Sequence, residues 1–374
     1  YFEKSNEGAE LTIPVFKILL RLPWHILLLA GILVAVGSLA LYSASQGSWQ
    51  PWAGRHAVRA VVGISLVIGI AFVDFSYIRR FSYPFFALSI AGLVAVLVMG
   101  AGHGVSRWIT IGGVNVQPSE PAKIAVVLAL AHYFSSQPHD RMRSFLWYLP
   151  ALLIIAVPFV LVLIQPDLGT ALMLLFGGLV VVFAAGLPWR YVLGSVVSVV
   201  AAIPVLWMHL HAYQKSRVMT FLNPELDVLG AGYQITQSKI ALGSGGVFGK
   251  GFLKGSQSQL NYLPEKQTDF VFTMIGEEFG FAGNVFILFV YLLLTISIMW
   301  ISFRVQSRFA QLACIGIAMT VFFYMFVNVA MVTGLLPVVG APLPFISYGG
   351  TSMLTLFIAF GIVASATVHD RRET

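Results

Sequence analysis

Two carboxylates and a lysine lie close together in a polar run between apolar stretches of this chain. The run is Asn261-Tyr-Leu-Pro-Glu-Lys-Gln-Thr-Asp269, and it holds Glu265, Lys266 and Asp269. A carboxylate beside an apolar wall has a raised pKa and can accept a proton as a general base. The pattern also predicts a short surface helix over 269–279, with a turn near Gly280, for which Asp269 would be a plain capping residue.

Two more sets of polar residues stand where apolar runs begin. Glu120 and Lys123 are three residues apart, so on one helix they share a face and can pair. Ser119 as N-cap with Glu120 in the first turn would explain them as a helix start. A buried pair would instead be a structural lock and part of a cavity wall. Asp167 follows a proline and is most simply the N-cap of the next span, facing the same outer side as Asp269.

Lysines accompany a glycine-rich stretch at 243–255. Lys239, Lys250 and Lys254, together with exposed backbone N–H groups, suit a phosphate. The stretch lacks the P-loop spacing, so a set of surface turns explains it equally well.

Prolines and glycines break the chain at about 334–350, just before the last apolar run. Ser347-Tyr-Gly-Gly-Thr-Ser352 then opens that run. Broken backbone at membrane depth is tolerated only beside protein or a watery cavity, so we expect a polar cavity at the outer face.

The composition requires a membrane to hold these groups. The chain is 58% hydrophobic and 10% charged, far from the values of a soluble domain. Its net charge of +7 comes mainly from basic residues at the ends of apolar runs, which favours membrane orientation over nucleic acid. By length, about ten spans are predicted, at 24–45, 56–73, 84–101, 121–136, 146–165, 168–187, 191–211, 282–303, 309–333 and 347–368.

Basic residues in alternate short loops predict the orientation. With ten spans they all fall on one side, which should be the cytoplasm, so both termini are expected there. These residues are Lys4, Lys17, Arg21, Arg79, Arg80, Arg141, Arg143, Arg190, Arg304, Arg308, Arg371 and Arg372.

The predicted fold is therefore an all-α polytopic membrane protein that forms a single domain over 1–374. A large structured extracytoplasmic loop, at about 212–281, separates spans seven and eight and includes a helix near 234–242. Because the chain starts at Tyr1 and not at a methionine, we expect the native protein to begin upstream.

An ordered set of motifs resembles the SEDS family (shape, elongation, division and sporulation) over nearly the whole chain. The segment Gly249-Lys-Gly251 followed by Ser256-Gln-Ser-Gln259 is similar to the elongation branch, although Gln267 stands where that branch commonly has a histidine. The other motifs are Gly104–Gly112 with Arg107-Trp108, Gln117-Pro-Ser-Glu-Pro-Ala-Lys123, Gln165-Pro-Asp-Leu-Gly-Thr170, Gly230–Gln234, Gln237–Ala241, Leu263–Phe270 and Pro344–Gly350.

The resemblance implies a peptidoglycan glycosyltransferase in the bacterial cytoplasmic (inner) membrane, which polymerises lipid II into glycan strands during elongation. Asp269 would be its general base, and lipid II both donor and acceptor, with undecaprenyl pyrophosphate released. Lys239, Arg107, Lys250 or a divalent cation (Mg or Mn) would stabilise the leaving pyrophosphate. The other expected cavity residues are Trp108, Glu120, Lys123, Asp167, Glu265 and Ser347.

The resemblance also implies a class B penicillin-binding protein as partner, because no transpeptidase sequence is present. The partner's membrane helix is expected on the late spans, near 282–333. The alternative function is a lipid II flippase or transporter, which would need many spans and a polar cavity but no outer base at Asp269.

Overall fold

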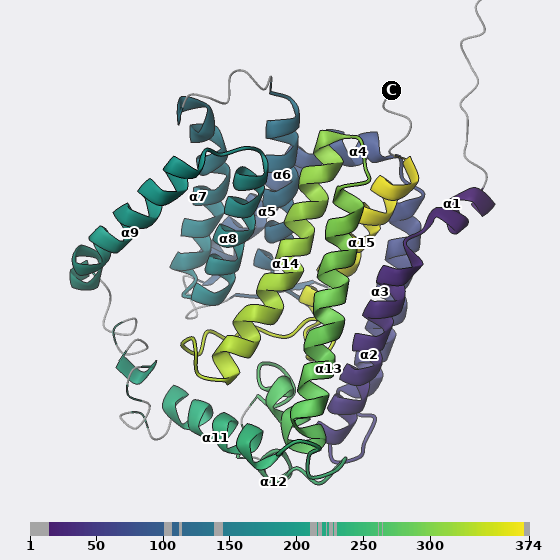
Figure 1. Cartoon of the computed structure of the whole chain (residues 1–374), viewed down its shortest axis with the longest axis vertical. Helices are drawn as coiled ribbons and strands as arrows, with labels where there is room; N and C mark the ends of the chain where they lie inside the picture. Colours follow the sequence, from purple (N-terminus) through teal and green to yellow (C-terminus); the bar gives the residue numbers. More distant parts are fainter. Residues whose placement is uncertain are drawn as a thin grey trace, which may run out of the picture.

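A helix stands at each of the ten apolar runs predicted from the sequence (Figure 1). The structure is a computed structural model, and it describes residues 15–100, 107–111, 114–137, 145–209, 215, 219–221, 223, 227, 230–260, 262–263 and 265–369. The elements in chain order are α1 (Val15–Arg21), α2 (Trp24–Ala44), α3 (Ala53–Ala71), α4 (Phe75–Arg80), α5 (Ser82–Gly100), β1 (Ile109–Ile111), β2 (Val114–Val116), α6 (Ser119–Ser135), η2 (Phe145–Tyr148), α7 (Leu149–Ile164), α8 (Leu168–Ala184), α9 (Trp189–His209), α11 (Ala231–Ser244), α12 (Ser256–Gln259), α13 (Val271–Ser302), α14 (Arg308–Val332) and α15 (Gly350–His369).

Seven of the described helices are long and apolar enough to cross a membrane. They are α2, α3, α5, the helix over 146–164 that contains α7, α13, α14 and α15. Helix α8 is apolar but shorter, and α6 and α9 occupy the two remaining predicted runs. The chain is thus a polytopic helical membrane protein, and the count of ten spans stays a prediction.

The helices differ in how much of their surface other helices cover. In α15, 78% of the apolar window is buried, against 28% in α3 and 22% in α5. Helix α15 therefore lies inside the bundle, while α3 and α5 present wide apolar faces to the outside. Helices α15 and α3 approach closely because Gly63 has no side chain, since a Cβ there would lie 2.0 Å from the ring of Phe357.

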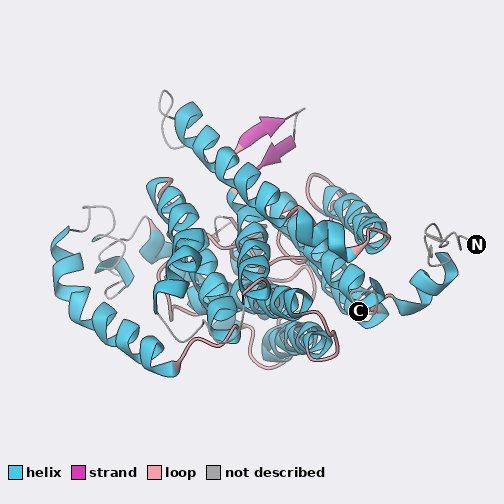
Figure 2. Ribbon diagram, turned by 90° about the horizontal axis from the view of Figure 1, so that it is seen from above, coloured by secondary structure: helices cyan, strands magenta, loops and turns pink. Residues whose placement is uncertain are grey.

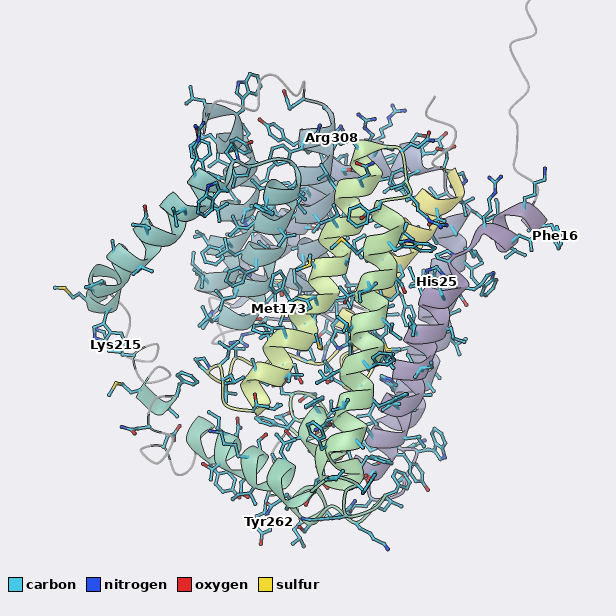
Figure 3. All side chains as sticks on the ribbon, viewed as in Figure 1. Phe16, His25, Met173, Lys215, Tyr262 and Arg308 are labelled. Atoms are coloured by element: carbon cyan, nitrogen blue, oxygen red, sulfur yellow. The ribbon has the colours of Figure 1, made fainter. Side chains whose placement is uncertain are left out.

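Some of the basic residues used to predict the orientation lie at the end of the bundle opposite the glycine-rich region. Helix α4, which ends with Arg79 and Arg80, lies at the same end as Arg308 (Figures 1 and 3). Helices α11 and α12 and Tyr262 lie at the other end. This separation is the one that the basic loops predict, although Lys4, Arg141, Arg143, Arg371 and Arg372 fall outside the described residues.

A small antiparallel hairpin precedes α6 and lies at the edge of the helical bundle, where its second strand contacts the start of α15 (Figure 2). It pairs Ile109 with Val116, Thr110 with Asn115 and Ile111 with Val114. We did not predict it, although Gly112-Gly113 between Ile-Thr-Ile and Val-Asn-Val is a known hairpin signal.

The helix predicted over 269–279 exists but is not at the surface. It forms the first part of α13, and Gly280 interrupts that helix with a φ of 71° and a ψ of −165°. Residues 271–278 are buried, because α11 and the turns at 245–251 cover them. The expectation of a surface helix was therefore wrong, whereas the turn at Gly280 and the helix near 234–242, now α11, are confirmed.

Candidate active site

Asp269 lies in the turn that leads into α13, and hydrogen bonds to its backbone and to neighbouring residues hold it there. The buried amide of Asn328 in α14 donates to the backbone oxygens of Asp269, at 2.9 Å, and of Ala341, at 2.6 Å. The hydroxyl of Ser347 donates to the backbone oxygen of Thr268 at 2.5 Å. The turn is thereby joined both to α14 and to the segment 334–349 that links α14 with α15.

The Asp269 carboxyl has a pKa of about 7, well above its ordinary value. Burial is the largest cause, and repulsion from the Glu265 and Asp167 carboxylates adds to it, while the Arg107 guanidinium acts in the opposite direction. Three predicted site residues from three separate segments, Glu265, Asp167 and Arg107, therefore act on the carboxyl group of a fourth, Asp269. A group with a pKa near 7 is suited to accept a proton at neutral pH.

Asp167 has two roles in the structure. Its carboxylate caps α8 by accepting from the backbone N–H of Thr170, at 3.2 Å, and from the Thr170 hydroxyl, at 3.0 Å. It also accepts from the side-chain amide of Gln117 at 3.1 Å. The predicted N-cap is confirmed, and the same buried carboxylate influences the pKa of Asp269.

Arg107 is anchored by backbone carbonyls at the end of α7. Its Nε donates to the oxygen of Gln165, at 3.1 Å, and one Nη donates to the oxygen of Pro166, at 2.5 Å. A guanidinium has five N–H groups, so this anchoring leaves donors for a substrate anion. Trp108, the next residue, is 47% exposed beside it at the start of the hairpin.

The segment 334–349 covers this region closely. A Cβ at Gly340 would lie 3.4 Å from a carboxylate oxygen of Asp269, and a Cβ at Gly169 would lie 3.1 Å from Val339. Gly340 also has a φ of 69°, which L side chains rarely adopt. The broken backbone predicted before the last span thus lies directly beside Asp269.

Glu265 is exposed and bonded within its own turn. Its carboxylate accepts from the Gln267 side-chain amide, at 3.2 Å, and from the Thr268 hydroxyl, at 3.0 Å. Gln267, which departs from the histidine of the elongation branch, supplies its backbone oxygen to the N–H of Tyr348 at 2.8 Å.

Glu120 and Lys123 form a buried ion pair of 2.9 Å in α6. Tyr324 in α14 donates its hydroxyl to Glu120, and the Lys123 ammonium lies 4.1 Å from the centre of the Tyr324 ring. The pairing that the spacing predicted is confirmed, and the contacts with Tyr324 join α6 to α14. Ser119 is not an N-cap, because it is the first residue of α6 and Pro118 stands in the capping position.

Two of the predicted lysines lie on other parts of the fold. Lys250 forms an ion pair of 2.8 Å with the buried Glu277, so its amine supports the turns that cover α13. Lys239 is exposed on α11, and its side chain lies against Gly334, where a Cβ would be 2.7 Å from the ammonium nitrogen. Lys239 thus lies at one end of the segment that reaches Asp269 at Gly340.

Two residues important for this geometry were not predicted. Asn328 is buried in the structure. Its position in the middle of the apolar run 309–333 was the signal in the sequence, because a polar side chain at membrane depth usually has a specific role. Glu277 accepts from Lys250 and from the backbone N–H groups of Gln257 and Ser258, which makes it the centre of the 250–260 turns.

The described residues do not fit a metal site made by the protein alone. Within them, no group of three His, Cys, Asp or Glu side chains is arranged to hold an ion. The Glu265 and Asp167 carboxylates each repel that of Asp269, but the three are not arranged to hold an ion. A role for Mg or Mn therefore stays a prediction.

Fold and site together define a polytopic helical membrane protein with a partly buried carboxyl group of raised pKa at one end of its bundle. A family model described as "Cell cycle protein", covering FtsW, RodA and SpoVE, matches residues 18–372. The chain belongs to this family, the SEDS family, as its motifs predicted.

Relatives and solved structures agree with this assignment. The peptidoglycan glycosyltransferase MrdB of Escherichia coli is 42% identical over 93% of this chain and 94% of its own length. A probable peptidoglycan glycosyltransferase FtsW of Trichlorobacter lovleyi is 38% identical over 90% of this chain and 91% of its own.

A solved structure described as a peptidoglycan synthase complex that coordinates polymerization and crosslinking matches with a TM-score of 0.82 and 31% identity, over 94% of this chain and 98% of that chain. The rod shape determining protein RodA of Thermus thermophilus matches with a TM-score of 0.69 and 28% identity, over 94% and 97%.

Proposed function

We propose that this chain is a peptidoglycan glycosyltransferase that polymerises lipid II at the outer face of the bacterial cytoplasmic membrane during cell elongation, with Asp269 as its general base. The observation that carries the proposal is the partly buried carboxyl of Asp269, whose pKa is raised to about 7, in a turn held by α14 and by the segment 334–349. The names of the relatives support the reaction class.

The reaction joins the 4-hydroxyl of an acceptor sugar to the anomeric carbon of a donor. The hydroxyl proton passes to the Asp269 carboxylate as the new bond forms, and the bond between the anomeric carbon and the pyrophosphate breaks. Asp269 is suited to this step because no described residue hydrogen-bonds to its carboxylate, so its oxygens can accept the proton. The raised pKa makes the ionised form a stronger base than an ordinary aspartate.

The leaving pyrophosphate carries charge that cations must stabilise. Arg107 suits this role best, because it is already close enough to Asp269 to lower that pKa and it keeps unused N–H donors. Lys239 is the second candidate, with an exposed amine beside Gly334. Lys250 is held by Glu277, so a role in phosphate binding would compete with that ion pair.

The membrane placement follows from the substrate. The undecaprenyl tail stays in the bilayer while the sugars react at its surface, which explains why a glycosyltransferase site is carried by membrane helices. With the basic end of the bundle in the cytoplasm, both termini are cytoplasmic and Asp269 lies outside.

A class B penicillin-binding protein is the proposed partner. Helix α13 offers it a continuous apolar stripe at helical spacing, formed by Phe281, Val285, Phe289, Leu292 and Ile296, which are all 43–69% exposed. Apart from Phe281, which directly precedes it, the stripe lies within the predicted contact region, 282–333. A related structure is described as a complex for polymerization and crosslinking, which supports this pairing.

Polymerisation of purified lipid II tests the proposal, using the detergent-solubilised chain with its partner. Asp269→Asn should abolish long glycan strands, because an amide cannot accept the proton. Asp74→Asn is the matched control, since Asp74 caps α4 at the opposite end and asparagine caps equally well.

If wild type and the Asp74 variant make long glycan strands and the Asp269 variant makes none, the result supports both the glycosyltransferase activity and Asp269 as its base. Equal strands from all three proteins would remove Asp269 as the base. No strands from any of them, beside an active control synthase, would favour the lipid II transporter.

A further inference from the structure

A small basic cavity lies at the opposite end of the bundle from Asp269. It has a volume of about 250 Å³ and lies between the corner of α1 and α2, the end of α13 and the end of α15. Arg21 and His25 line it from the corner, Trp300 and Arg304 from α13 and the turn after it, and Thr367 from α15. Its size suits a headgroup better than a large ligand.

Local contacts fix two walls of this cavity. The indole N–H of Trp24 donates to the backbone oxygen of Leu19 at 2.9 Å, which fixes the corner that carries Arg21 and His25. The Arg304 guanidinium lies 3.6 Å from the centre of the Trp300 ring. His25 is seen at this side of the bundle, below α1, in Figure 3.

The positive charge of the cavity is not neutralised by the described protein. Its lining contains two arginines and a histidine but no acidic residue. Neither Arg21 nor Arg304 forms an ion pair with a carboxylate among the residues that the structure describes. Uncompensated arginines that converge on a cavity indicate an anionic ligand.

The surroundings of the cavity indicate that this anion carries a lipid tail. Large apolar side chains beside it face outward, and tryptophans of this kind mark the level of lipid headgroups. The exposed fractions of these apolar side chains are 71% for Phe16, 66% for Leu20, 52% for Trp24, 66% for Leu28 and 75% for Phe303. Basic pockets between membrane helices at the cytoplasmic side bind anionic headgroups.

We propose that this cavity binds the phosphodiester headgroup of an anionic phospholipid, with Arg21 and Arg304 on the phosphate oxygens and Thr367 and His25 toward the glycerol. The acyl chains then lie on the apolar faces of α2 and α13. The bound lipid joins α1, α2, α13 and α15 at the end of the bundle opposite the site. This binding site is independent of the reaction proposed for Asp269.

Native mass spectrometry of the full chain in detergent tests the proposal, with phosphatidylglycerol as the probe and phosphatidylcholine as the neutral comparison. Wild type should retain one phosphatidylglycerol with an affinity about ten-fold above that for phosphatidylcholine, because both lipids carry the same phosphodiester but the two arginines repel the choline ammonium. The double variant Arg21→Gln with Arg304→Gln should lose this preference. The variant with lysine at both positions should keep most of it.

The matched control is Arg80→Gln with Arg190→Gln, which removes the same charge from exposed positions outside the cavity. It should bind like wild type. Equal binding by the cavity variant and wild type, or no preference in wild type, would overturn the proposal. Displacement of the lipid by millimolar inorganic phosphate would assign the cavity to a soluble anion, which also overturns it.

Discussion

The side-chain amide of Asn328 donates to the backbone oxygen of Asp269 at 2.9 Å and, with the same nitrogen, to that of Ala341 at 2.6 Å. One buried side chain of α14 therefore positions both the turn with the proposed base and the segment that covers it. The geometry of the Asp269 turn therefore depends on a fully buried residue of a neighbouring helix.

Asn328→Ala should lower both activity and stability. Two carbonyls lose their donor, and unsatisfied buried groups cost about 1–3 kcal/mol each. We expect the polymerisation rate per folded molecule to fall about ten-fold or more, because a displaced base is a poor base. Thermal unfolding and a lipid II assay check this. Unchanged activity with reduced stability would make Asn328 purely structural.

Arg107→Ala and Asp167→Asn should move the pH dependence of the reaction in opposite directions. Arg107 lowers the pKa of Asp269, so its loss raises the pH at half-maximal rate. Asp167 raises that pKa, so its neutralisation lowers this pH, while asparagine still caps α8. Rate profiles between about pH 5 and 9 measure both shifts. Shifts of the same sign would contradict the arrangement of charges.

Much of the fold was predictable because length and apolarity decide where a membrane helix forms. The ten runs each contain a helix, and Asp167 caps α8 as its position indicated. The buried state of residues 271–278 was not predictable, because it depends on α11 and the turns around Glu277, which are distant in sequence.

The candidate site was predictable in its residue types more than in its grouping. Asp269, Asp167, Glu265 and Arg107 were chosen separately, and only the three-dimensional structure shows that they influence one pKa. Lys250 could not be excluded from the site on sequence alone, because its ion-pair partner Glu277 lies 27 residues away.

Removing one partner of the Glu120–Lys123 pair should lower the stability of the protein strongly, whereas replacing both partners should lower it little. Glu120→Gln leaves a buried ammonium without its counter-charge, which costs about 3–5 kcal/mol. The double variant with Lys123→Met removes both charges and should recover most of the stability. Thermal unfolding in one detergent compares the three proteins. If the double variant recovers no stability, the loss comes from the hydrogen bond between Tyr324 and the Glu120 carboxylate and not from the unpaired charge of Lys123.

Asp269→Asn should stabilise the protein at high pH. The folded pKa of about 7 lies above the ordinary value of 3.8, so the folded state loses stability as pH rises between these two values. The variant cannot ionise and avoids this loss. Its melting temperature should exceed that of wild type at pH 8 by more than at pH 5. An equal difference at both values would indicate that Asp269 keeps an ordinary pKa.

The most direct test of Asp269 as the base is the pH dependence of lipid II polymerisation by the wild-type chain with its partner. The rate should rise about ten-fold per pH unit on the acid side and level off above a midpoint near pH 7, because only ionised Asp269 accepts the proton. A rate that stays constant from about pH 5.5 to 8.5 would contradict this role.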